Sequence, residues 1–308
     1  MDLRQLRYFT VLTEQQHYGR AANLLHVAQP ALSRQIRLLE EELGTRLFER
    51  HARGATPTQE ALFLHERSIY LLRYVDQLKH DMLTRQKDPQ GPVVLGLSPG
   101  LAQLLALRLT RALRDAYPKA RIKVHEAFAP SLHSMLLKGS VDLAILNEPV
   151  PGGDVALNPL LSESICLIGR PGELPAAKRI RMRQLAGIPL VLTGIPGSGV
   201  RLELEAAAAS AGVRLNAVAE VETVNIAKQL VADGIGMTVH FAAAVQRELA
   251  AGKLEAIPLE NLHLKRVLAR SSIRPLSRAT EVLTVVIHDV LRELINDGQW
   301  PNAKLQMR

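Results

Sequence analysis

Residues 20–50 read RAANLLHVAQPALSRQIRLLEEELGTRLFER, and this stretch predicts two short helices joined by a tight turn. The second helix is expected over about residues 29–43, where one face carries apolar residues at helical spacing: Leu32, Ile36, Leu39 and Leu43. Pro30 suits the first turn, because its missing N–H would have no partner within the helix. Gly44 suits the end, where a left-handed residue terminates a helix at low cost.

The opposite face of this helix is short and polar, with Pro30, Ser33, Arg34 and Arg37. The helix before it, at about 19–26, has small alanines that permit close crossing, and an earlier one with Leu3, Leu6, Phe9 and Leu12 covers the pair. Three helices with the third exposed predict a helix-turn-helix, whose second helix enters the major groove of DNA. Gln29, Ser33 and Arg34 are then expected at base edges and Arg37 at phosphate. The alternative is a small helical subdomain with a solvated polar face.

The order and spacing of about 60 N-terminal residues resemble the DNA-binding domain of LysR-type transcriptional regulators. The similarity runs from MDLRQLRYF at 1–9, through the stretch quoted above, to Arg53-Gly54 and to TPT at 56–58. It implies a winged helix-turn-helix over 1–58, with Arg50 and Arg53 on a wing that reaches a narrow minor groove. For Arg50, an ion pair with Glu49 is the alternative. The resulting candidates for DNA contact are Gln29, Pro30, Ser33, Arg34, Arg37, Arg50 and Arg53.

Two features depart from the family pattern or from ordinary helix electrostatics. Relatives usually have Ser or Thr near the start of the second helix, whereas this chain has His17-Tyr18-Gly19, so Gly19 is the expected cap and a hydroxyl contact to phosphate is lost. Glu40, Glu41 and Glu42 crowd the negative end of the third helix, and arginine partners are therefore expected near them.

Length and charge set the broad class. A chain of 308 residues corresponds to about two domains. The net charge is +8, but residues 1–90 contain 13 Lys and Arg against 11 Asp and Glu, while the rest contains 25 against 19. The DNA-binding prediction therefore depends on the placement of a few arginines and gains little from bulk charge.

Cysteine content and hydropathy indicate a cytoplasmic, soluble protein. The single cysteine, Cys166, excludes an intramolecular disulfide framework and lies in an apolar run typical of a buried strand, with a redox sensor as the less favoured alternative. Arg4 and Arg7 interrupt any signal-peptide core, and no apolar stretch reaches the roughly 18 residues that a membrane span needs.

Residues 59–91 are expected to form a linker helix and hinge. The run from Gln59 to about Gln86 lacks Gly and Pro, and two apolar lines follow it: Leu64, Ser68, Leu71, Val75, Leu78 and Met82 in one, and Leu62, Ile69 and Leu72 in the other. One line can dock on the helix-turn-helix, and the other then needs a partner. A second copy is the simplest partner, which predicts a dimer on an inverted-repeat site, and the family implies tetramers as well. Intramolecular packing is the alternative.

After Pro92, strands alternate with helices in a βαβαβ order, which predicts a mostly parallel sheet covered by helices. Residues 92–308 resemble the α/β, periplasmic-binding-protein-like effector domain of the LysR type. The implied first half is 92–164 plus 267–297, and the second is 165–266. The segment at 270–278 resembles the nitrogen-assimilation-control branch.

A ligand is expected at the carboxyl ends of the strands, where turns rich in small polar residues begin helices. These turns aim N–H groups and hydroxyls at one place, which favours a small organic or aromatic acid. The candidate residues are Ser98, Pro99, Ser131, Thr193 and Thr223. Helix capping is the alternative for each. His240-Phe241 replaces the Leu-Pro of many relatives, so the loop there is expected to differ.

The competing function classes have little support. Residues 194–199 are glycine-rich but lack the Lys-Ser/Thr of a phosphate-binding loop, and no zinc or nucleophile-elbow motif occurs. A solute-binding protein without a DNA role would lack the first 60 residues' pattern. We therefore predict a non-enzymatic LysR-type regulator without cofactor or metal. Its expected partners are double-stranded DNA, an anionic effector and further copies of itself, and RNA polymerase is a further candidate.

Overall fold

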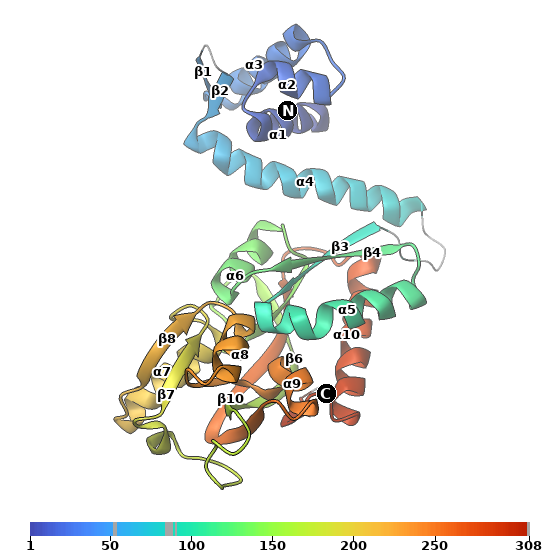
Figure 1. Cartoon of the computed structure of the whole chain (residues 1–308). Helices are drawn as coiled ribbons and strands as arrows, with labels where there is room; N and C mark the ends of the chain where they lie inside the picture. Colours follow the sequence, from blue (N-terminus) through green and yellow to red (C-terminus); the bar gives the residue numbers. More distant parts are fainter. Residues whose placement is uncertain (52–53, 84–88, 90, 307–308) are drawn as a thin grey trace. The chain divides into compact units, whose positions relative to one another are not determined.

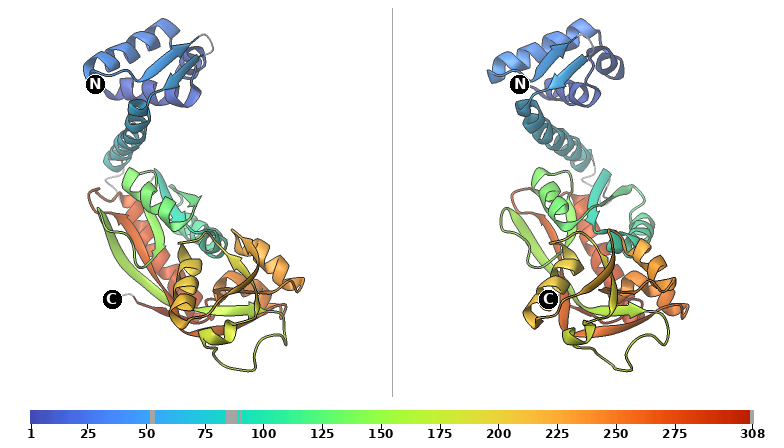
Figure 2. Two further views of the ribbon diagram at one scale, coloured as in Figure 1. Left: turned by 90° about the vertical axis from the view of Figure 1, so that its left-hand side faces the viewer. Right: turned by 60° about the vertical axis from the view of Figure 1, so that its left-hand side comes forward.

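The computed structural model describes residues 1–51, 54–83, 89 and 91–306. Contacts divide the chain into two compact units, residues 1–86 and residues 87–308, which are described separately (Figures 1 and 2).

The first unit is a helical domain with a small β-hairpin and a long helix (Figure 2). Its elements are α1 (Leu3–Gln15), α2 (Tyr18–Leu24), α3 (Gln29–Leu43), β1 (Phe48–His51), β2 (Gly54–Pro57) and α4 (Gln59–Leu83). Helix α3 has the predicted bounds, with Pro30 in its first turn and Gly44 at φ 66° after its end. One prediction for its buried face is wrong: Leu32, Ile36 and Leu39 are fully buried, but Leu43 is 40% exposed because it lies in the last turn, beyond the core.

Two local predictions are corrected at the helix ends. His17, and not Gly19, caps α2, because its Nδ1 accepts hydrogen bonds from the backbone N–H groups of Gly19 and Arg20. Of the three glutamates, Glu41 alone has an arginine partner among the described side chains, namely Arg37. Glu40 instead accepts the backbone N–H groups of Leu47 and Phe48, which fixes the start of the hairpin, and Glu42 pairs with the N-terminal ammonium group.

The core of this unit forms around Phe9, whose ring lies 5.7 Å from that of Phe48. Helix α4 joins it through Ala61 and Leu64, so its N-terminal part packs on α1. Large apolar side chains farther along α4, or on its other face, are exposed: Leu62, Phe63, Ile69, Leu71, Leu78 and Met82.

The second unit is an α/β domain (Figure 1). Its first part comprises β3 (Gly91–Leu97), α5 (Pro99–Ala116), β4 (Ala120–Glu126), α6 (Ala129–Lys138), β5 (Leu143–Asn147) and β6 (Val155–Gly169). Next come η1 (Met182–Leu185), β7 (Pro189–Thr193), α7 (Gly199–Ala211), β8 (Asn216–Val221), α8 (Val224–Ala232) and β9 (Met237–Phe241). The chain ends with η2 (Ala242–Val245), α9 (Gln246–Ala250), β10 (Glu255–Ser271), α10 (Arg278–Asn296) and β11 (Ala303–Leu305).

Within the described residues, nine strands form one mixed sheet in the order β4-β3-β5-β10-β6-β9-β7-β8, with β11 on β6. The groups β4-β3-β5 and β8-β7-β9 are parallel, as predicted. The long antiparallel strands β6 and β10 bridge them, because β10 pairs with β5 near one end and β6 pairs with β9 near the other. Each of these two strands therefore runs through both parts of the sheet.

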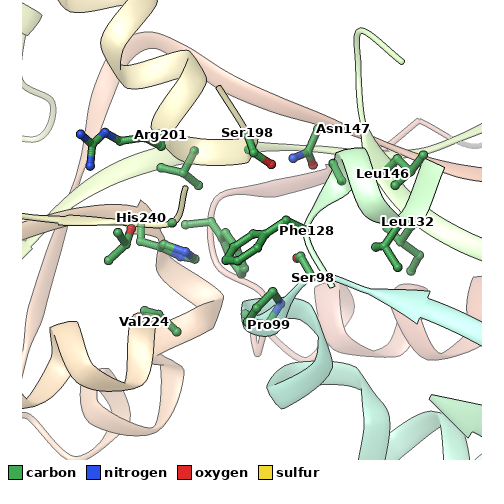
Figure 3. Close-up of a pocket in the computed structure, with 18 of the residues that line it drawn as sticks. Ser98, Pro99, Phe128, Leu132, Leu146, Asn147, Ser198, Arg201, Val224 and His240 are labelled. Atoms are coloured by element: carbon green, nitrogen blue, oxygen red, sulfur yellow. The ribbon is translucent and has the colours of Figure 1, made fainter. Parts of the chain in front are cut away.

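Helices cover both faces of the sheet. Helices α5 and α10 pack together against β3, whereas α6 packs on the other side against β5 and β10 (Figure 1). At the carboxyl ends of β3, β5 and β7, the chain passes close to the N-termini of α5, α6 and α7 (Figure 3).

Candidate functional site

The polar face of α3 is available at the surface of the first unit. Gln29, Pro30, Arg34 and Arg37 are exposed, and Ser33 is half-buried. Arg37 lies 3.4 Å from Glu41 across one helical turn, and both side chains are largely exposed, so water screens this pair. A helix that buries one apolar side and presents amide and guanidinium groups on the other has the shape and chemistry for major-groove contact.

The hairpin after α3 corresponds to the expected wing. Strand β1 includes the backbone of Arg50, paired with Ala55 of β2, whereas Arg53 lies outside the described residues. His51 and Thr56 hydrogen-bond across the hairpin at 3.0 Å between Nε2 and Oγ1. This bond joins the two strands of the hairpin, whereas the Glu40 contacts tie the hairpin to the end of α3.

A pocket lies at the carboxyl ends of β3, β5 and β7, and we call it the effector pocket because the sequence predicts the effector site at these strand ends (Figure 3). Its cavity volume is about 60 Å³. An apolar cavity that holds benzene measures roughly 150 Å³, so this conformation accommodates only a few ligand atoms without opening.

The structure brings together three of the five predicted effector residues. Ser98, Pro99 and Thr193 line the effector pocket, whereas Ser131 and Thr223 do not. Ser131 is exposed because α6 begins at Ala129, two residues before it, which places the hydroxyl on the outer side of the first turn. Thr223 caps α8 by position, but its neighbours Glu222 and Val224 line the pocket instead. Neither Ser98 nor Thr223 uses its hydroxyl as a helix cap.

Several pocket residues were missed as candidates. Asn147, Ser198 and His240 point toward the space around Phe128 (Figure 3). Asn147 ends a buried strand and Ser198 precedes α7, so their positions carried the same signal that singled out Ser98. The only sequence signal at His240 is the departure of His240-Phe241 from the Leu-Pro of many relatives.

A buried ion pair lies beneath the effector pocket. Arg266 and Glu163 are 2% and 1% exposed, and Nε of Arg266 donates to Oε1 of Glu163 at 2.6 Å. Trp300 Nε1 donates to the other carboxylate oxygen at 2.6 Å, and the Arg266 guanidinium lies 4.6 Å from the centre of the Phe241 ring. The charge of Arg266 is therefore neutralised within the protein.

The same guanidinium orients Asn147. Nη1 of Arg266 donates to Oδ1 of Asn147 at 2.7 Å, which leaves the amide NH₂ group free to donate elsewhere. Arg201, the other arginine of the pocket wall, pairs with Glu205 and Glu220 and extends its guanidinium away from Phe128 (Figure 3). The pocket thus offers neutral donors, while its two guanidinium groups already have carboxylate partners.

His240 adds a neutral imidazole. Its side chain is 9% exposed, and its buried Nδ1 has no hydrogen-bond partner among the described residues. Burial, and then the charge of Arg266, lowers its pKa to about 3. Gly100 permits this placement, because a Cβ there would lie 3.1 Å from Cε1 of His240.

Comparison with protein families identifies both units. Residues 3–62 match the model of the bacterial regulatory helix-turn-helix protein of the lysR family, and residues 86–292 match the LysR substrate binding domain. The chain belongs to the LysR family. It is a LysR-type DNA-binding transcriptional regulator with an effector-binding domain, as the sequence resemblance implied.

Curated LysR relatives match most of the chain. The HTH-type transcriptional regulator BbuR of Bordetella bronchiseptica is 29% identical over 98% of this chain and 93% of its own length. The nitrogen assimilation regulatory protein nac of Klebsiella aerogenes is 28% identical over 100% and 99%, which supports the predicted similarity to that branch. The hydrogen peroxide-inducible genes activator of Pectobacterium carotovorum is 32% identical over 87% and 89%. All three names describe gene regulators, which argues against an enzymatic role.

Solved LysR structures share the fold. A full-length OxyR variant from Pseudomonas aeruginosa has a TM-score of 0.72 at 25% identity, with 95% of each chain covered. Full-length CbnR in complex with its target DNA has a TM-score of 0.68 at 19% identity, covering 95% of this chain and 99% of that one.

In the described part of the chain, no helix has the length and apolar character needed to span a bilayer. Across residues 1–51, 54–83 and 91–306, no group of three or more His, Cys, Asp or Glu side chains is placed to hold a metal ion.

Proposed function

We propose that this regulator binds an inverted-repeat operator as a dimer and responds to a small anionic effector in the effector pocket. The observation that carries the DNA part is the division of α3 into a fully buried apolar face and an exposed polar face. Gln29, Ser33 and Arg34 read base edges, Pro30 allows the helix start to approach the groove, and Arg37 contacts phosphate. Arg50 and Arg53 of the wing contact the minor groove.

Helix α4 supplies the dimer contact in this proposal. Its exposed apolar side chains include Leu71, Leu78 and Met82, spaced by seven and four residues along the helix. That spacing suits a seam between two identical helices, which would place two copies of α3 on the two half-sites. Assembly of two dimers into a tetramer, and contact with RNA polymerase in the cytoplasm, are further parts of the proposal.

The effector part depends on the donors of the pocket. The Ser98 and Ser198 hydroxyls do not cap their helices, and Asn147 has a free NH₂ group, so all three can donate to a carboxylate. The N-termini of α5 and α7 meet there and favour negative charge. Glu222, at the exposed mouth, is the one opposing carboxylate in the wall without an ion-pair partner among the described residues. The small volume favours a short acid, and an aromatic acid requires the pocket to open.

Our domain assignment places the effector pocket between two half-domains, so that a ligand there can change their closure. We propose that residues 1–58 form the DNA-binding domain, 59–91 the linker, and 92–308 two half-domains, namely 92–164 with 267–297 and 165–266. The effector pocket has walls from both halves, since Ser98 belongs to one and Ser198 to the other. A ligand that binds one closure state more tightly shifts the population of that state.

A binding experiment tests the regulator proposal. We would measure the affinity of the full chain for its own upstream DNA and for a scrambled duplex, at several salt concentrations. Arg34→Ala is expected to weaken specific binding by about 1–3 kcal/mol and to relax base preference. Arg37→Ala, the matched variant one turn along α3, is expected to lower the affinity for both duplexes alike. It should also reduce the slope of log affinity against log salt concentration by about one. Equal affinity of the parent for both duplexes would refute the operator proposal.

A further inference from the structure

A second cavity adjoins the effector pocket, and we call it the annex. Its volume is about 190 Å³, roughly three times that of the pocket. The two cavities have common wall residues: Ala129, Leu146, Asn147, Ser198 and Gly199. A ligand bound by Asn147 and Ser198 can therefore extend from the pocket into the annex.

The wall of the annex is largely apolar. It includes Pro130, Pro149 and Pro151, together with Leu202, which is 42% exposed. Proline has no N–H group, so these three residues offer no backbone donor to an anion. The annex therefore differs from the pocket, where hydroxyl, amide and helix N-terminal groups donate.

The charges of the annex are also opposite to what an anion needs. Its charged wall residues are Glu148, which follows Asn147 at the end of β5, and Glu203, in the second turn of α7. Neither carboxylate has an ion pair or a side-chain hydrogen bond within the part of the chain that the structure describes. Nε2 of His133, in the same wall, is buried without a hydrogen-bond partner there. Two unpaired carboxylates beside an apolar wall attract a cation.

We propose that the annex binds the ammonium end of a zwitterionic effector whose carboxylate occupies the effector pocket. This inference rests on the proposed function, which places an acid in the pocket. Two independent features among the described residues point to a ligand across both cavities. In the pocket wall, His240 is nine-tenths buried and its Nδ1 has no partner, and in the annex two uncompensated carboxylates accompany the unpartnered Nε2 of His133. The effector is thus an amino acid or a similar compound that carries an acid and an amine on one short chain.

Matched pairs of probes test the charge of the far end. The full chain would be titrated at neutral pH with acetate and glycine, propionate and β-alanine, butyrate and 4-aminobutyrate, and valerate and 5-aminovalerate. Within each pair, the chain length is equal and only the ammonium group is added. At least one amino acid is expected to raise the Tm and to bind about tenfold more tightly than its matched acid, because a charge pair near the surface contributes on this order.

Conservative variants test which residues cause the preference for the amino acid over its matched acid. Glu148→Gln and Glu203→Gln keep the side-chain size and remove the charge, so the double variant is expected to lose the preference for the amino acid and to retain affinity for the matched acid. Glu260→Gln, an exposed position on β10 outside both cavities, is the control. Ser98→Ala is expected to weaken both members of a pair alike.

The outcomes separate the two proposals. If acids bind but their amino counterparts bind no better, or if the double variant keeps the preference, the annex proposal is overturned and the acid-binding pocket stands. If no acid or amino acid of the series stabilises the chain, both proposals fail. A preference that Glu260→Gln also removes would assign the effect to general surface charge and overturn the annex proposal.

Discussion

Arg266 donates a hydrogen bond from Nη1 to the side-chain oxygen of Asn147 across 2.7 Å. Trp300 donates to Glu163, and Glu163 accepts from Arg266, so residues far away in sequence orient Asn147 at the end of β5. The buried network therefore fixes the orientation of the Asn147 amide and leaves its NH₂ group free. The effector pocket can for this reason donate a hydrogen bond to a ligand.

The first prediction concerns that amide. Asn147→Asp keeps an oxygen for Arg266 but replaces the NH₂ donor with a carboxylate oxygen, so it is expected to preserve folding and weaken acid binding. A hydrogen bond to a charged group contributes about 1.5–3 kcal/mol, which sets the minimum loss. Calorimetric titration with an acid that stabilises the parent checks this. Unchanged affinity would show that Asn147 does not donate to the ligand.

The second prediction concerns the buried pair. Glu163→Gln leaves Arg266 as an uncompensated buried charge, and breaking such a pair costs about 3–5 kcal/mol. Urea unfolding of the full chain measures the loss. The control is Glu281→Gln, which breaks an exposed pair with Arg278 and is expected to cost at most about 1 kcal/mol. Equal effects of the two variants would contradict the importance of burial.

His240 gives a prediction about pH. Burial lowers its pKa to about 3, below the unfolded value of about 6.5, so the unfolded state takes up the proton first as pH falls. The stabilisation is present above about pH 6.5 and is lost toward pH 3, with a slope approaching about 1.4 kcal/mol per pH unit. His240→Gln is expected to remove this slope between about pH 4.5 and 6.5 and leave the profile above about pH 7 unchanged. Parallel unfolding profiles for the parent and the variant would contradict a buried neutral imidazole.

Cys166 is expected to be inert in the folded protein. Burial, and then the nearby charge of Glu163, raises the pKa of this single cysteine to about 12, so almost no thiolate is present at neutral pH. Iodoacetamide should label it only after unfolding in urea. Operator affinity should not change with peroxide, in the parent or in Cys166→Ala. Fast labelling of the native chain would overturn this prediction.

The α4 seam predicts the oligomeric state. Leu78→Glu places a charge in the proposed helix–helix contact and is expected to shift the dimer toward monomer, with weaker binding to the full inverted repeat. Analytical ultracentrifugation measures the change. Val285→Glu, a 55% exposed apolar position on α10, is the control for added surface charge. A dimer that survives Leu78→Glu would place the contact elsewhere.

The local sequence pattern was sufficient to predict the bounds of an element wherever a single apolar periodicity runs along it. The bounds of α3 followed from leucines at helical spacing between Pro30 and Gly44. The length of β6 did not follow, because Pro159 lies inside it and proline usually ends a strand. The structure tolerates this proline where the pairing with β10 shifts register, between the partners of Arg266 and Val267. That register depends on a strand about a hundred residues away, so no local rule predicts it.

The sequence by itself determined the class of this protein: about 60 N-terminal residues resemble the LysR DNA-binding domain in order and spacing, and alternating strands and helices follow them. The tertiary structure alone decided which polar residues meet. Of the residues that the sequence predicted, Ser98 and Thr193 line the effector pocket and Ser131 does not, whereas Asn147 and His240 line it without having been predicted. The physical reason is separation along the sequence. Helical and strand periodicities involve residues a few positions apart, whereas the effector pocket forms where the ends of strands from distant segments come together.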